Sequence, residues 1–315
     1  MLKGSIKKNL LQAIPAYTIL LIMIVIASTF SADFSSQRNI RNIISQSMTL
    51  AIVAIGQTFV LLIGGIDLSV GSTISLSTVI LASVSSIAGY GIPAALLLSI
   101  ACGALVGLIN GIGIVRFRIP PMIITISTAS IIKGVSLLIL PKPGGKISLQ
   151  LLDFFSAKFG LLSVSSIIAV LLYFVAFIVL HYTSFGREIY ATGNDTLHAK
   201  QSGISTDQVT IFAYIASGIF AVIAGMVLSM RVFSGDALIG DGYSMDSVAS
   251  AVIGGVSLLG GIGSVIGSLA GAFVLGMINN VMNMLKVYAY YQYIIKGSIL
   301  VFALLIFRLK RRKKA

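Results

Sequence analysis

The sequence has few of the residues that build soluble surfaces or reactive centres. Charged residues make up only 10% of the chain, tryptophan is absent and there is one cysteine, Cys102. Soluble domains average roughly 25% charged residues, so this composition excludes a soluble globular fold. One cysteine cannot form an internal disulfide, and its apolar surroundings indicate a small packing residue. Without tryptophan, the residues left to anchor a membrane interface are Tyr288, Tyr290, Tyr291 and Tyr293.

Groups for catalysis or metal binding are also scarce. His181 and His198 are the only histidines, and neither belongs to a metal-ligand pattern. Residues 144–148 superficially resemble a phosphate loop, but Lys146 is followed by Ile147 instead of Ser or Thr. We therefore expect no enzyme activity, no bound metal or cofactor and no ATP site in this chain. Any pumping must draw energy from an ion gradient or from another subunit.

Long uncharged stretches dominate the rest of the chain. Hydrophobic residues make up 57% and the mean hydropathy is +1.03. A helix needs about 20 apolar residues to cross a hydrocarbon core of about 30 Å. Stretches of this length, two of them long enough for two spans, are 9–32, 42–66, 68–115, 159–186, 208–230 and 247–285. Two more spans each tolerate a lysine, Lys133 or Lys296. The sequence thus predicts an all-α polytopic membrane protein, one transmembrane domain of about ten helices, with the lipid bilayer as solvent.

The net charge of +13 has a topological explanation. No long soluble surface exists to carry a basic groove, so we do not expect nucleic acid as a partner. Cytoplasmic loops of membrane proteins are enriched in Lys and Arg. Placing both termini in the cytoplasm puts thirteen of these residues inside and seven outside. In this orientation residues 144–158 lie outside and residues 182–207 lie inside.

One motif interrupts the apolar pattern. Residues 64–72 read Gly-Gly-Ile-Asp-Leu-Ser-Val-Gly-Ser, and Asp67 is the only charge between Asn42 and Val115. Two glycines can end one helix, and Asp or Ser can cap the next. A helix broken in a membrane requires protein or a water-filled cavity around its backbone. We interpret Asp67 first as a cap and hydrogen-bond hub, and second as an ion-coupling site. The residues assigned to broken helices along a path are Gly64, Gly65, Asp67, Ser69, Gly71, Ser72, Gly254 and Gly255.

The two halves of the chain, 1–158 and 159–315, resemble each other. The glycines of 64–72 are echoed in 254–264, and each half has a ridge of glycines at four-residue spacing: Gly103, Gly107 and Gly111, then Gly263, Gly267 and Gly271. Such ridges let helices approach closely in lipid. Two inverted halves with paired broken helices are a recurrent transporter design. The alternative is that glycine-rich helices are alike by composition alone.

Residues 182–207 form the one substantial inside loop. We expect a short helix over 196–202, capped by Asn194 or Asp195 and ended by Gly203. Residues 205–208, Ser-Thr-Asp-Gln, match a capping box that opens the next span. This helix is either a contact for a partner or a solvated connector.

Several separated motifs carry a family resemblance from about residue 39 to residue 307. In chain order they are 54–58, 64–72, 193–204, 242–249, 252–255, 260–264 and Asn279–Asn280. Together they resemble the ribose-type permease subunits of ATP-binding-cassette (ABC) importers. The chain departs from that pattern at Thr192, where a second glycine is usual, and at Lys133, where an arginine is common.

The resemblance implies partners and a location. It implies a dimer with a second copy or a paralogue in the bacterial cytoplasmic membrane, two cytoplasmic ABC ATPase subunits that use ATP, and an extracytoplasmic sugar-binding protein. The implied cargo is a monosaccharide such as ribose, galactose or xylose, or an autoinducer-2-like sugar, moved by alternating access. The implied ATPase-coupling loop is Gly193, Asn194, Asp195, Thr196, Leu197, His198, Ala199, Lys200, Ser202 and Gly203. Open alternatives are an ion-coupled carrier and a related permease for nucleosides or branched-chain amino acids.

A neutral sugar needs hydroxyl and amide partners. By polarity alone the possible substrate contacts are Gln57, Thr58, Asn110, Thr125, Asn279 and Asn280. Each of them fits an interhelix hydrogen bond better than a sugar contact.

Overall fold

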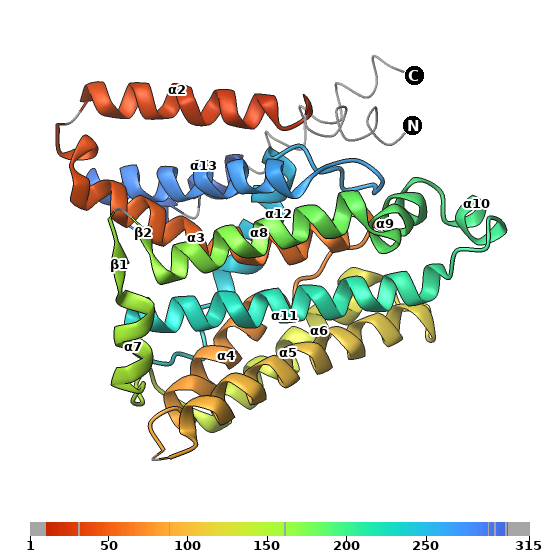
Figure 1. Cartoon of the computed structure of the whole chain (residues 1–315), viewed down its shortest axis with the longest axis horizontal. Helices are drawn as coiled ribbons and strands as arrows, with labels where there is room; N and C mark the ends of the chain where they lie inside the picture. The colour runs from red at the N-terminus through yellow and green to blue at the C-terminus, as the bar shows by residue number, and fades with distance from the viewer. Residues whose placement is uncertain are drawn as a thin grey trace.

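The computed structural model describes residues 11–30, 32–87, 89–160, 162–288, 290–292, 294–299 and 301. Tyr293 and the basic tail at 302–315 lie outside the described residues. The elements are α2 (Ile14–Phe30), η1 (Ala32–Ser35), α3 (Gln37–Leu62), α4 (Val70–Val84), α5 (Gly91–Val115), α6 (Pro121–Ile139), α7 (Leu149–Ser156), β1 (Lys158–Phe159), β2 (Leu162–Ser163), α8 (Val164–Tyr182), α9 (Ser184–Asn194), α10 (Thr196–Gln201), α11 (Thr206–Val232), α12 (Asp241–Ile253) and α13 (Val265–Met284) (Figure 1).

The described part of the chain is built from membrane-length helices. α3, α5, α6, α8, α11 and α13 are long and apolar enough to cross a bilayer, while α2 and α4 are apolar but shorter. The all-α polytopic class is therefore confirmed. The count of ten spans stays a prediction, because the span expected around Lys296 runs beyond the described residues. The division of the chain at residue 158 also stays a prediction.

Helices α3 and α11 form the centre of the molecule. Every α3 residue from Ser47 to Leu62 is buried, and a Cβ added to Gly56 would lie 2.8 Å from the Cα of Ser217 on α11. α5 packs on α11, and α13 packs on α3. The outer faces of α2, α5, α6 and α8 expose large apolar side chains, as lipid-facing helices do.

The glycine ridges bring helices into close contact. A Cβ on Gly103 of α5 would lie 2.6 Å from the carbonyl oxygen of Gly218 on α11. On α13, Gly267 and Gly271 meet the carbonyls of Gly254 and Ser250 in the same way. The ridge on α5 therefore packs helices, as the four-residue spacing predicts. In the second ridge Gly267 and Gly271 do the same, whereas Gly263 lies in the irregular segment before α13.

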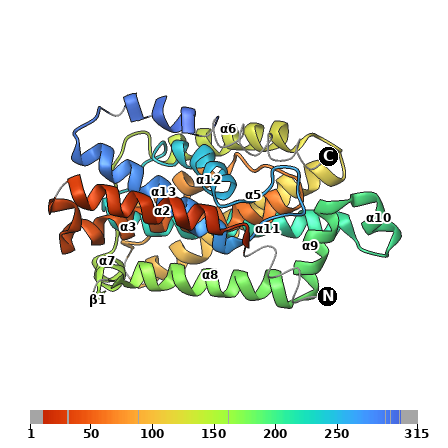
Figure 2. The ribbon, with the colours of Figure 1, turned by 90° about the horizontal axis from the view of Figure 1, so that it is seen from above.

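The molecule has two distinct ends. α9 and α10 project at one end, and α7 with the β1–β2 hairpin lies at the other (Figures 1 and 2). The segment before α2 lies near the second break, because a Cβ on Gly255 would be 2.7 Å from the carbonyl of Gln12. Residues 144–158 and 182–207 thus lie at opposite ends, as expected.

Two short helices begin in the interior. With 15 and 13 residues, α4 and α12 measure about 22 and 20 Å, less than a full crossing. Irregular segments 63–69 and 233–240 lead into them. Residues 236–240 run along α4: Thr78 Oγ1 accepts from Asp236 N (3.1 Å), and Ser75 Oγ accepts from Gly240 N (2.9 Å). The first turns of both helices therefore meet, with Gly240 against Gly71.

This arrangement changes the expected pairing of the breaks. Residues 64–72 precede the half-length helix α4, whereas residues 254–264 follow the half-length helix α12. The segment that takes the place of 63–69 in the second half is 233–240, because each leads from a central helix into a short one. The glycine echo between 64–72 and 254–264 does not join equivalent elements.

Candidate functional site

Asp67 lies at the centre of a buried polar cluster beside the first break. The side chain is 1% exposed. Its Oδ1 accepts from the Ser69 amide (2.9 Å) and from Ser69 Oγ (2.6 Å), and Oδ2 accepts from Ser217 Oγ on α11 (2.8 Å). Ser69 is the N-cap of α4, but its own side chain makes no capping bond. The carboxylate of Asp67 therefore organises the start of α4 from two residues before the cap.

Two amide side chains connect this cluster to further helices. With its amide oriented to satisfy both groups, Gln57 of α3 donates to the Asp67 carbonyl (3.0 Å) and accepts from the Asp67 amide (3.3 Å). Asn110 of α5 donates through Nδ2 to Ser69 Oγ (2.9 Å). The break is thus bound to α3, α5 and α11 by hydrogen bonds in a buried site, where each bond is strengthened.

Of the other residues proposed as substrate contacts, Thr125 reaches the break through a hydrogen bond to the Ile66 carbonyl (3.5 Å), and the rest lie apart or bond locally. Thr58 donates to the carbonyl of Ala54 (2.6 Å), and Thr125 donates to that of Pro121 (2.9 Å). Asn280 forms a two-way amide pair with Asn39 of α3 (2.9 and 3.2 Å). Asn279, the last of the six possible substrate contacts, is half-buried. Ser72, which was assigned to the broken helix instead, is buried in the first turn of α4. Of the six possible contacts, the structure gathers Gln57 and Asn110 around Asp67.

The two breaks touch each other and the end of α9. The Leu62 carbonyl, in the last turn of α3, accepts from the Gly261 amide (2.8 Å). Gly193 lies against both groups, so closely that a Cβ there would overlap the Leu62 oxygen. A Cβ on Gly260 would lie 3.0 Å from Gly193 Cα and 3.0 Å from Gly64 N. Sequence reasoning missed this junction, because three segments distant in the chain form it through backbone atoms.

Positive φ angles explain why glycines occupy the junction. Gly64 has a φ of +80°, Gly260 +86° and Gly261 +71°. L side chains rarely adopt this region, and a Cβ on Gly260 or Gly261 would also lie within 3.0 Å of neighbouring atoms. At the second break, Gly254 is the C-cap of α12 and Gly255 has a φ of +91°. Gly65 faces Tyr214, whose hydroxyl would lie 2.5 Å from a Cβ added there.

The segment expected as a coupling loop is more helical than the sequence indicated. Gly193 and Asn194 belong to the last turn of α9, a helix that we did not expect. Its start was detectable: Thr183 follows the apolar run and accepts from Gly186 N (3.2 Å), as an N-cap does. α10 follows directly, and Gly203, with a φ of +83°, ends it as predicted.

Asp195 caps α10. Its Oδ1 accepts from the amides of Leu197 and His198 (both 2.9 Å), and Oδ2 lies 2.7 Å from His198 Nδ1. These hydrogen bonds, chiefly from His198, lower the pKa of the Asp195 carboxyl. The predicted capping box at 205–208 is wrong: Ser205 is the N-cap of α11, but its side chain accepts no capping bond.

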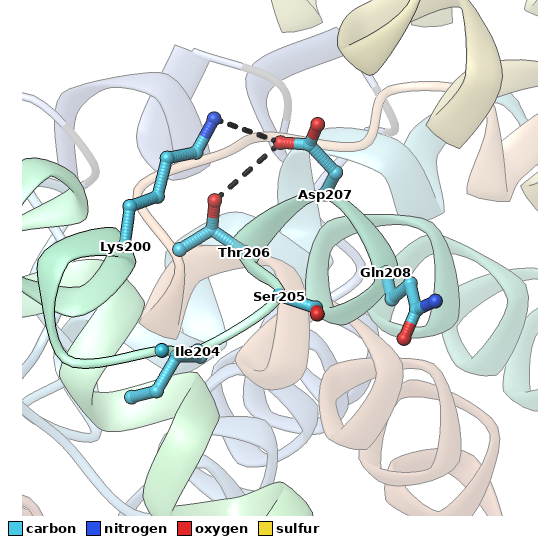
Figure 3. A pocket seen from close by; sticks show the side chains of 7 residues that line it. Lys200, Ile204, Ser205, Thr206, Asp207 and Gln208 are labelled. Carbon is cyan, nitrogen blue, oxygen red and sulfur yellow. Dashed lines mark hydrogen bonds and ion pairs between the residues drawn. The ribbon is translucent and has the colours of Figure 1, made fainter.

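An open pocket of about 430 Å³ separates α10 from the start of α11 (Figure 3). Its lining is Lys200, Gly203, Ile204, Ser205, Thr206, Asp207 and Gln208. Lys200 Nζ lies 3.0 Å from Asp207 Oδ1, which also accepts from Thr206 Oγ1 (3.4 Å). Both charged groups are more than half exposed, so this pair holds α10 only weakly. Leu197 and Lys200 on α10 and Ser202 after it are exposed, whereas Ala199 packs inward.

Comparison with known proteins agrees with this architecture. Residues 39–304 match the family model described as "Branched-chain amino acid transport system / permease component". The chain is 35% identical over 300 residues to the ribose import permease protein RbsC of Haemophilus influenzae, covering 92% of this chain and 91% of the relative. It is 32% identical to the galactose/methyl galactoside import permease protein MglC of the same organism, covering 99% of each chain.

A third relative is the autoinducer 2 import system permease protein LsrC of Yersinia pseudotuberculosis, which is 34% identical over 89% of this chain and 80% of the relative. No solved structure matches the chain. The resemblance drawn from the separated motifs is confirmed by matches that span nearly the whole sequence. The chain therefore belongs to the permease-component family, in the branch of the ribose-type permeases of ABC importers.

Proposed function

We propose that this chain is the membrane-spanning subunit of an ABC importer that moves a monosaccharide into the cytoplasm. The relatives that match along nearly its full length are named as import permeases for ribose, galactose or methyl galactoside, and autoinducer 2. All of these cargoes are small, polar molecules. The proposed partners are two cytoplasmic ATPase subunits, an extracytoplasmic binding protein and a second permease copy or paralogue.

The junction at Gly193 carries the proposed mechanism. α10 is exposed at one end of the molecule, and only Asp195 separates it from α9, whose last turn holds Gly193 at the point where the breaks at 63–69 and 254–264 touch. An ATPase that shifts α10 therefore acts on both breaks through backbone contact. ATP binding closes the ATPase pair, the breaks rearrange, and the sugar received at the opposite end moves inward by alternating access.

The ion-coupled carrier remains the weaker candidate. Both carboxylate oxygens of Asp67 accept hydrogen bonds from Ser69 and Ser217 within the protein. A coupling site needs free coordination for its ion, and Asp67 has little to offer. This geometry favours a structural carboxylate and an energy source outside the chain.

Purification together with the natural membrane partners tests the proposal. We expect a stoichiometric ATPase to accompany the chain, and a monosaccharide with its binding protein to raise ATP turnover. Uptake into vesicles supplied with ATP should continue when a protonophore collapses the proton gradient. Loss of uptake under the protonophore, with no ATPase attached, would move the function to an ion-coupled carrier.

Gly193→Ala tests the coupling step. The added Cβ would displace α9 from Leu62, so we expect ATP hydrolysis to become partly uncoupled, with uptake reduced about tenfold or more. Gly134→Ala is the control, because Gly134 on α6 has open space around its Cβ. Normal transport by Gly193→Ala would remove this junction from the mechanism.

A further inference from the structure

Two ion pairs join α12 to α6 and to the C-terminal segment. Lys133 Nζ of α6 is 2.6 Å from Asp241 Oδ2, at the first residue of α12. Lys296 Nζ is 2.8 Å from Asp246 Oδ2, little more than one turn further along α12. Each lysine that the spans were expected to tolerate therefore has a carboxylate on the same short helix.

The first pair cannot face hydrocarbon. Lys133 lies six residues, or about 9 Å, before the end of α6, inside a helix that is long and apolar enough to cross a bilayer. The side chains of Lys133 and Asp241 are 39% and 48% exposed, whereas those of Lys296 and Asp246 are 22% and 16% exposed. Charged groups within spans face a bundle interior or a water-filled cavity. The surface around Lys133 and Asp241 must therefore meet water or polar protein.

The neighbours of this pair leave room for a ligand. Gly242, next to Asp241, is exposed, and a Cβ there would meet nothing within 4 Å. Ser130 is exposed one turn before Lys133 on the same side of α6. α12 begins at Asp241, so no earlier helical turn covers the exposed residues Asp241 and Gly242.

We propose that Lys133, Asp241 and the open first turn of α12 line an aqueous path and hydrogen-bond the passing monosaccharide. This inference rests on the proposed function and names a sugar-contacting surface for it. Sugar hydroxyls can donate to the carboxylate and accept from the ammonium group. A neutral polyol can thus bind between the two charges and leave them balanced when it moves on. The residues singled out by polarity around Asp67 are not part of this surface.

Thiol labelling tests whether the surface is wet. In the full importer carrying Cys102→Ala, Gly242→Cys adds a thiol beside Asp241 without breaking the ion pair. Ile131→Cys is the control, because Ile131 is 67% exposed. It precedes Lys133 by two residues, about 200° around the helix, and so lies on the opposite side of α6. Thiolates form in water and not in hydrocarbon. We expect a charged, membrane-impermeant methanethiosulfonate to label residue 242 at least tenfold faster than residue 131, and the labelled importer to lose uptake.

Equal and slow labelling at both positions would overturn the inference, because lipid or a second permease copy would then cover the surface. Labelling at residue 242 that leaves uptake intact would overturn it as well. Uptake and ATPase association of the unlabelled importer are measured in the same preparation. These two measurements test the proposed function, whereas the labelling tests only whether the surface around Lys133 and Asp241 is wet.

A double substitution separates a sugar contact from a structural pair. Lys133→Met combined with Asp241→Leu removes both charges and keeps side-chain volume, and a partly exposed ion pair contributes little to the free energy of unfolding. We expect the melting temperature to be retained and uptake to fall about tenfold. A folded double variant with normal uptake would show that the pair only joins α6 to α12. If the variant does not fold, the labelling comparison decides.

Discussion

Among single residues, Asp67 shows how a carboxylate persists inside a membrane protein. Ser69 and Ser217 supply three donors to its two oxygens, and Gln57 satisfies its backbone. Removing the side chain would leave these donors unpaired, and each buried unpaired group costs about 1–3 kcal/mol. The carboxylate therefore stabilises the break at 63–69 whether or not it touches cargo.

Two substitutions at Asp67 separate the role of its hydrogen bonds from the role of its charge. Asp67→Leu should greatly reduce the amount of folded protein, because Ser69 and Ser217 lose their acceptors. Asp67→Asn keeps an acceptor oxygen, and its amide can donate to a rotated Ser217 hydroxyl, so we expect most of the uptake to remain. Thermal denaturation in detergent and sugar uptake measure the two effects. A folded Asp67→Asn protein without uptake would support ion coupling instead.

The sequence predicts some of these roles well, because they are local. Asp67 stands two residues before Ser69, and Asp195 stands directly before α10, so spacing alone indicates a turn and a cap. Partners from distant segments were not predictable. Nothing in the sequence pairs Asn280 with Asn39, and polarity alone suggested Asn280 as a sugar contact.

At the scale of secondary-structure elements, the half-length helices α4 and α12 set the architecture. Their first turns meet at Gly71 and Gly240, where one backbone lies against the other. Hydropathy cannot locate such helices. An apolar run such as 68–115 or 247–285 has a known length, but hydropathy does not show where within the membrane a helix begins. Residues 231–246 were expected only as a connection between two spans, so the return of residues 233–240 along α4 and the start of α12 at Asp241 were missed.

Two neighbouring glycines test this meeting point. Gly240→Ala would place a methyl group against the Gly71 carbonyl, and overpacking of this kind costs about 1–3 kcal/mol. Gly242→Ala, one residue into α12, adds the same group in open space. We expect a lower melting temperature for Gly240→Ala and little change for Gly242→Ala. Equal melting temperatures would mean that the two helices do not depend on this contact.

The cap of α10 predicts a pH dependence. Hydrogen bonds lower the pKa of Asp195 in the folded protein, so its support of α10 is present at neutral pH and is lost as the pH falls through that lowered pKa. We expect the amides of Leu197 and His198 to exchange hydrogen more slowly than in Asp195→Ala at neutral pH, with the difference vanishing in acid.

Asp195→Asn serves as the matched control for that measurement, since asparagine caps helices without titrating. Its α10 amides should stay protected in acid under conditions where those of the wild type do not. Loss of protection at the same pH in both proteins would assign the transition to another group.

For the whole molecule, the distribution of positive charge predicts orientation. The argument from Lys and Arg places α10 in the cytoplasm and α7 outside, and the structure puts these helices at opposite ends (Figure 1).

Leu197 on α10 and Leu149 on α7 are 65% and 75% exposed, so both suit a reporter cysteine in a Cys102→Ala background. In intact cells stripped of any outer membrane, an impermeant thiol reagent should label Leu149→Cys at once and Leu197→Cys only after the membrane is opened. The reverse order would invert the protein, and α10 would then face away from any cytoplasmic ATPase. Because the proposed coupling runs from α10 through Gly193 to both breaks, this one measurement decides whether ATP can reach the transport path from the side on which the cell supplies it.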